Sequence, residues 1–108
     1  MATGILGSAD LAATTDTLLY TTPATTFTVA TVSLCNRSGS TVTVRISTPL
    51  NTTPGNTDYL EYDTQILANG VLERTGIVLD STRRIYVRAS GTGVTALAYG
   101  IETSIATA

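Results

Sequence analysis

The segment "TTFTVATVSLCNRSGSTVTVRIS" (residues 25–47) decides the fold class of this chain. Its first half is rich in β-branched and aromatic residues, which suit the pleated, half-buried surface of a strand. In its second half Val42, Val44 and Ile46 alternate with polar residues, the period-2 pattern of a strand with one buried face. Between the halves, "NRSGS" carries Gly39, which suits a positive φ in a turn. We therefore predict two strands joined as a hairpin.

Comparable strand patterns recur along the rest of the chain, and no window shows a helical period. The further strand-like runs are "TDTLLYTTP", "YLEYDTQIL", "VLERTGIVLD", "RRIYVRAS" and "VTALAYGIETSI". In "YLEYDTQIL", alternation places Leu60, Tyr62 and Ile66 on one face. The longest loop is "TPLNTTPGNTD". About seven short strands with turns every 8–12 residues or so predict an all-β fold, a single antiparallel β-sandwich or small barrel.

The chain of 108 residues has the length of one domain. Residues 1–16 are weakly patterned, and we expect them to form an extended N-terminal arm or an edge strand. We expect residues 17–108 to form the β-sandwich domain. The N-terminal segment carries Ile5, Leu6 and Leu11, so we expect it to dock on another surface rather than to hang free.

The composition argues against enzyme chemistry. The chain has no histidine, so a Ser–His–Asp or Cys–His unit is excluded. Cys35 is the only cysteine, which rules out an intramolecular disulfide and a zinc cluster, and its apolar surroundings predict a small buried side chain. Glu61 and Asp63 could serve a glycosidase or a calcium ion, but the solvent side of a strand accounts for them better. We expect no enzyme activity, no cofactor and no metal site.

The N-terminus "MATGILGSADLA" has neither a charged start nor a long apolar run. It therefore predicts neither a signal peptide nor a transmembrane helix, and we expect synthesis in the cytoplasm and no membrane partner.

The stretch "DSTRRIYVRAS" (residues 80–90) holds three of the six basic residues, all of which are arginine. Strand alternation places Arg84, Tyr86 and Arg88 on one exposed face. This row could bind single-stranded nucleic acid, with the tyrosine stacking on a base. It could also be a solvated face that pairs with Glu61 and Asp63 across the sheet. A third reading is a protein interface, because arginine and tyrosine are enriched in interfaces and lysine is depleted. The net charge of −2 argues against nucleic acid.

Two stretches carry a resemblance to a known class of proteins. They are the opening "MATGILGSADLAATTDTLLYT…TFTVATVSLCNRSGSTVTVRI" and the run "ANGVLERTGIVLDSTRRIYVRASGTGVTALAYGIE". Both resemble small all-β virion structural proteins of tailed bacteriophages, especially phages of cyanobacteria and other aquatic bacteria. The likeness spans nearly the whole chain and contains no catalytic motif. No functional residue is therefore carried over from it.

The resemblance implies a virion component that is made in the cytoplasm of a bacterial host. The leading expectation is a capsid decoration (cement) protein that binds the outer face of the head lattice. Its partner would be the major capsid protein, and we expect self-association as a dimer or trimer. The alternative is a tail, baseplate or fibre component with tail proteins as partners, in which "TPLNTTPGNTD" and exposed tyrosines contact host glycans. A single-stranded nucleic-acid-binding module is the third reading. The predicted interface residues are Ile5, Leu6, Leu11, Tyr59, Arg84, Tyr86 and Arg88.

Overall fold

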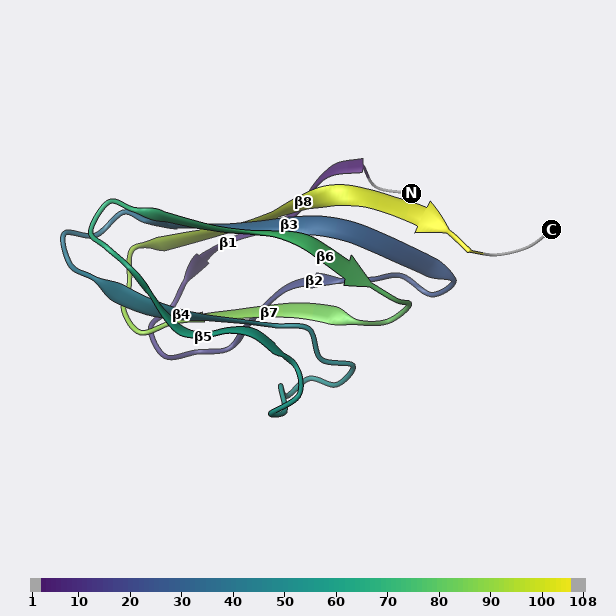
Figure 1. Ribbon diagram of the computed structural model, residues 1–108, viewed down its shortest axis with the longest axis horizontal. Helices are drawn as coiled ribbons and strands as arrows, with labels where there is room; N and C mark the ends of the chain where they lie inside the picture. The colour runs from purple at the N-terminus through teal and green to yellow at the C-terminus, as the bar shows by residue number, and fades with distance from the viewer. Residues whose placement is uncertain (1–2, 106–108) are drawn as a thin grey trace.

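The computed structural model describes residues 3–105, which form eight β-strands in two sheets (Figure 1). In chain order the strands are β1 (Thr3–Leu11), β2 (Thr17–Thr21), β3 (Thr26–Asn36), β4 (Val42–Ser47), β5 (Tyr59–Ile66), β6 (Val71–Leu79), β7 (Arg84–Ala89) and β8 (Val94–Ser104). Sheet A has the order β1-β8-β3-β6, and sheet B has the order β2-β7-β4-β5. All strand pairs are antiparallel, which confirms the predicted all-β sandwich with one strand more than expected. Over residues 3–105 we find no membrane-spanning helix.

The two sheets arise from a single long hairpin that is rolled up on itself. β1 pairs with β8, β2 with β7, β3 with β6 and β4 with β5, so the loop between β4 and β5 is the tip of the hairpin. Two further pairings, β3 with β8 and β4 with β7, close the roll into two sheets. This arrangement is an eight-stranded jelly roll.

The prediction that the two strands of residues 25–47 pair as a hairpin is wrong. β3 lies in sheet A and β4 lies in sheet B, so the turn between them crosses from one sheet to the other. Asn36, which is fully buried, supplies the physical reason. Its amide nitrogen donates to the backbone carbonyls of Ser40 and of Ile66, at 2.7 and 3.1 Å. Its oxygen accepts from the backbone N–H of Ser38 at 3.0 Å, so the side chain holds a corner where a hairpin turn would otherwise form.

The core lies between the inner faces of the two sheets. The predicted alternation of Val42, Val44 and Ile46 is confirmed, because all three side chains are buried. In β7, Ile85 and Val87 alternate with Arg84, Tyr86 and Arg88 and are likewise fully buried. The largest fully buried apolar side chains are Leu34, Ile46, Leu79, Ile85, Val32, Val44, Val87 and Val94.

The extended N-terminal arm is not found, because residues Thr3–Leu11 form edge strand β1 along β8. Leu11 is only 2% exposed, and Leu6 packs partly buried against the core. A Cβ added at Gly7 would lie 2.1 Å from the carbonyl oxygen of Leu19 in β2, so β1 also lies close against sheet B. The segment therefore docks on its own domain, where the free edge of β8 supplies hydrogen bonds and the core receives both leucines.

Strand β5 departs from the alternation that its sequence predicts. Asp63 has a φ of 53°, and the register with β4 shifts between Val44 and Ile46. Such a bulge turns the following side chains relative to the preceding ones. As a result Ile66 is buried as predicted, whereas Tyr62 is 58% exposed and does not share its face.

Candidate interaction surfaces

The arginine row of β7 lies on the outer face of sheet B, as its alternation predicts. Arg84 and Arg88 are half-buried, but Tyr86 between them is only 8% exposed. The expectation of an exposed tyrosine at this position is therefore wrong. Its register partner in β4, Ser47, is buried as well, so this part of the outer face is covered.

The covering segment is the start of the loop between β4 and β5. The backbone N–H of Arg84 donates to the carbonyl of Pro49 at 2.9 Å, and the Arg84 guanidinium donates to the carbonyl of Leu50. The guanidinium of Arg83 donates to the carbonyl of Thr48 at 2.8 Å. Both neighbouring arginines therefore bind the loop to β7 instead of offering a basic surface.

All six arginines of the chain lie within residues 3–105, and each has a partner inside the protein. Five of them pair with carboxylates, and Arg84 binds a carbonyl as described. The pairs are Arg37–Asp10 at 2.5 Å, Arg45–Asp63 at 2.7 Å, Arg74–Glu61 at 3.0 Å, Arg83–Asp80 at 3.1 Å and Arg88–Asp16 at 3.9 Å. Glu61 and Asp63 thus pair with Arg74 and Arg45, not with the arginines of β7.

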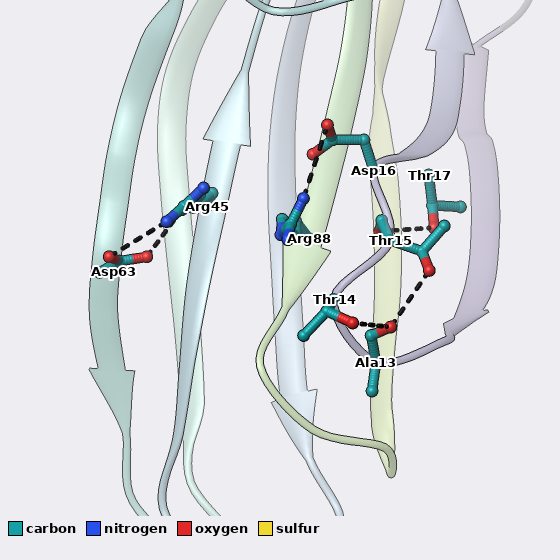
Figure 2. A network of polar contacts seen from close by, with 8 residues as sticks. All are labelled: Ala13, Thr14, Thr15, Asp16, Thr17, Arg45, Asp63 and Arg88. Atoms are coloured by element: carbon teal, nitrogen blue, oxygen red, sulfur yellow. Dashed lines mark hydrogen bonds and ion pairs between the residues drawn. The ribbon is translucent and has the colours of Figure 1, made fainter.

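A polar pocket of about 180 Å³ opens on the outer face of sheet B. Figure 2 shows the charged side chains at this place, Arg45 with Asp63 and Arg88 with Asp16. Arg45 of β4 and Arg88 of β7 line it from directly opposite register positions. The hydrogen bond from Arg45 holds the pKa of the Asp63 carboxyl below its usual value, and Arg88 adds to this effect. Asp63 is therefore ionised at neutral pH.

Two tyrosines of β5 extend from Arg45, which lines the pocket, although neither tyrosine is itself a lining residue. The Arg45 guanidinium carbon sits 4.1 Å from the centre of the Tyr62 ring. Tyr59, one of the predicted interface residues, meets Tyr62 edge-on at a centroid distance of 4.9 Å. Such cation–π and edge-to-face contacts hold the exposed Tyr62 ring in one orientation.

The outer face of sheet A carries a group of side chains that we call the apolar face, formed by the exposed Ile5, Val29, Val78 and Ile101 and the half-buried Tyr99. Val29 of β3 lies directly opposite Ile101 of β8 and Val78 of β6, so the three side chains form a row across three strands. Ile5 lies opposite Tyr99 in the adjacent row. The exposed fractions are 64% for Ile5, 44% for Val29, 68% for Val78 and 54% for Ile101.

Charged groups lie at the margins of the apolar face. The Tyr99 hydroxyl donates to Glu73 at 3.0 Å, and this bond raises the pKa of Tyr99. The Arg37–Asp10 pair lies toward the other end of the same sheet. Cys35, which was expected to be buried, is half-buried on this outer face because it has the same strand parity as Val29.

The seven predicted interface residues do not form one surface. Ile5 lies on sheet A, whereas Tyr59 and the residues of the arginine row belong to sheet B, and Leu6 and Leu11 pack in or against the core. The row of Val29, Val78 and Ile101 was missed because its members come from three strands that are far apart in sequence. Strand alternation could have shown that each of these side chains points outward. It could not show that the three lie side by side, because that depends on the pairing register of the strands.

A buried polar cluster also escaped the sequence analysis. The Tyr20 hydroxyl of β2 donates to the Glu102 carboxylate of β8 and lies 2.9 Å from the hydroxyl oxygen of Thr28 in β3. Burial, and then the bond to Glu102, raise the pKa of Tyr20 to about 12. The cluster therefore ties sheet B to sheet A through a neutral tyrosine and a carboxylate.

Compared with protein-family models and with curated protein sequences, the chain matches none. Within residues 3–105, no group of three or more acidic or cysteine side chains is placed to hold a metal ion.

Proposed function

We propose that this protein is a non-enzymatic structural component of a tailed-phage virion, which decorates the head by docking on the major capsid protein. The observation that carries the proposal is the apolar face. Contiguous exposed apolar side chains on a soluble domain mark a surface that another molecule covers. Val29, Val78 and Ile101 stand in one row, so a flat partner could contact all three together.

Two further features support a virion role. The jelly roll is an architecture that recurs in viral capsid and lectin domains, although this is an analogy of fold alone. The sequence also resembles phage virion proteins. A decoration protein stabilises a shell because it binds the assembled state preferentially, and repetition over the lattice multiplies a modest contact.

The alternative is a tail, baseplate or fibre component, and the polar pocket on sheet B favours it as a surface that contacts host glycans. Copy number separates the two: hundreds of copies per virion indicate the head, and a few to some tens indicate the tail. Nucleic-acid binding is the weakest reading. Five arginines pair with carboxylates and Arg84 binds a carbonyl, so the chain, whose net charge is −2, offers no excess of cations for phosphate binding.

Charge substitutions on the apolar face test the docking. We expect Val78→Asp and Ile101→Asp each to lower the occupancy of purified capsids at least tenfold, because a carboxylate would lose its water on docking. Leu67→Asp is the matched control, since Leu67 is 67% exposed but lies in the turn before β6. Native-like circular dichroism of the variants separates lost docking from lost folding.

Unchanged occupancy with both variants would overturn the proposed docking surface. The apolar face could instead serve self-association. A dimer or trimer of the isolated protein that Val78→Asp converts to a monomer, while the monomer still loads capsids fully, would assign the face to that contact and contradict the lattice role. Light scattering measures the mass.

A further inference from the structure

The polar pocket on sheet B is built around two like charges. Arg45 and Arg88 are directly opposed on neighbouring strands, an arrangement that is unfavourable unless anions compensate it. Asp63 lies on the outer side of Arg45, and Asp16 lies on the outer side of Arg88 (Figure 2). Both guanidinium groups line the pocket with the Asp63 carboxylate, and Asp16 is not a lining residue, so cationic groups outnumber anionic groups in its wall and favour a negative ligand.

The two arginines differ in how fully they are bonded. Asp63 takes two donors of Arg45, Nε at 2.7 Å and Nη2 at 3.3 Å. Arg88 reaches Asp16 only at 3.9 Å, beyond hydrogen-bond distance, and within residues 3–105 it makes no side-chain hydrogen bond. An arginine has five N–H donors in a planar fork that matches a carboxylate. Arg88 therefore presents an unused fork in a pocket, with its side chain 33% exposed.

Hydroxyl groups line the pocket together with that fork, and an aromatic ring lies against Arg45 next to it. Thr14, Thr43 and Ser90 line the pocket, and the Ser90 hydroxyl oxygen accepts from the backbone N–H of Thr43 at 2.9 Å, which leaves its proton free to donate. Tyr62 presents a ring that is 58% exposed beside Arg45. Sugars use both kinds of group, because their hydroxyls form hydrogen bonds and their C–H faces pack on aromatic rings.

We propose that this pocket binds the carboxylate-bearing residue of an acidic saccharide. The carboxylate takes the fork of Arg88, the sugar hydroxyls bind Ser90 and Asp63, and the ring packs beside Tyr62. The volume of about 180 Å³ equals the share of roughly six liquid waters, so it holds one sugar ring and not a longer segment.

The surroundings favour a saccharide over an acidic peptide. Peptides commonly bind by adding a strand to a free sheet edge. The pocket opens over β4 and β7, which are the two inner strands of sheet B and are paired on both sides. The saccharide site does not depend on the proposed docking, because the apolar face belongs to the other sheet.

The test is a titration of the full chain followed by amide chemical shifts in NMR. The ligands are digalacturonic acid, its dimethyl ester, sodium acetate and inorganic phosphate. We expect digalacturonic acid to bind with shifts clustered at the pocket, and the neutral ester to bind at least tenfold more weakly. Arg88→Gln should weaken the acid at least tenfold, whereas Arg37→Gln, which removes an ion-paired arginine on sheet A, should leave it unchanged.

Tyr62→Ser separates sugar recognition from simple anion binding, since it should weaken digalacturonic acid and leave acetate unaffected. Equal affinity for acetate or phosphate would show an anion site without sugar recognition and overturn the proposal. Equal affinity for the dimethyl ester would remove the role of the carboxylate. The absence of pocket shifts with every ligand, in a protein with a native spectrum, would overturn the site itself.

Discussion

Asn36 is the residue at which three sheet-to-sheet connections meet. Its side-chain amide binds Ser40 in the β3–β4 connection and Ile66 at the start of the β5–β6 connection. Its backbone N–H donates to Gly70, and the next residue donates to Gly93 in the β7–β8 connection. The side chain of Asn36 therefore joins two of these connections, and the adjacent backbone bonds bring in the third.

We expect Asn36→Ala to lower the free energy of unfolding by about 3 kcal/mol, because it removes a buried hydrogen-bond network that water cannot replace. Urea denaturation measures the loss. Ser33→Ala is the control from the same strand, and it should change stability by less than about 0.5 kcal/mol because Ser33 is half-buried on the outer face. An equal, small effect of both substitutions would contradict the role given to Asn36.

Tyr20 should make stability depend on alkaline pH. The folded pKa of about 12 lies above the ordinary value of 10.0, so folding favours the protonated hydroxyl. This contribution is complete below pH 10 and is lost as the pH rises toward 12. We expect Tyr20→Phe to be less stable at pH 7 by about 1–2 kcal/mol, because Glu102 loses a donor, and to lose less stability between pH 10 and 12.

Urea denaturation at several pH values tests this expectation. Tyr59→Phe serves as the control and should keep the alkaline decline of the parent protein. The raised pKa of Tyr99 is common to all three proteins and cancels in the comparison. An alkaline decline in Tyr20→Phe as steep as that of the parent would show that the Tyr20–Glu102 bond does not carry it.

At the scale of the elements, the position of β1 depends on a close approach to β2. A Cβ at Gly7 would lie 2.1 Å from a backbone oxygen of Leu19, which cannot move aside as a side chain can. We expect Gly7→Ala to destabilise the fold by about 2 kcal/mol through overpacking. A Cβ at Gly39 meets nothing within 4 Å, so Gly39→Ala should be nearly neutral. Thermal unfolding compares the two, and equal midpoints would contradict the tight β1–β2 contact.

The elements also show which features the sequence could predict. Strand existence and inward parity follow from local alternation, as with Val42, Val44 and Ile46. The pairing partner of a strand does not follow from local alternation. Gly39 suits a hairpin turn, whereas the buried amide of Asn36 holds a connection that crosses from one sheet to the other. A bulge at Asp63 turned Tyr62 outward, and alternation alone contains no sign of such a change.

At the scale of the whole molecule, surfaces were harder to predict than the fold. Ile5 was predicted as an interface residue and lies on the apolar face, but its neighbours depend on the register of β1 with β8 and of β3 with β6 and β8. Tyr86 points outward as predicted, yet the loop that Arg84 binds covers it. Surface composition results from pairings between distant segments, which local patterns do not encode.

The rolled hairpin has a consequence for how the chain folds. Among the eight strands of residues 3–105, β4 and β5 alone are neighbours both in sequence and in a sheet, so we expect pairing to begin around the loop at residues 48–58 and to proceed outward to β1 and β8. Pairings between distant segments make folding slow, on a scale of about milliseconds to seconds. Both partners of β3 come after it in the chain, so during synthesis β3 cannot pair before β6 is made, and its second edge stays open until β8 is made.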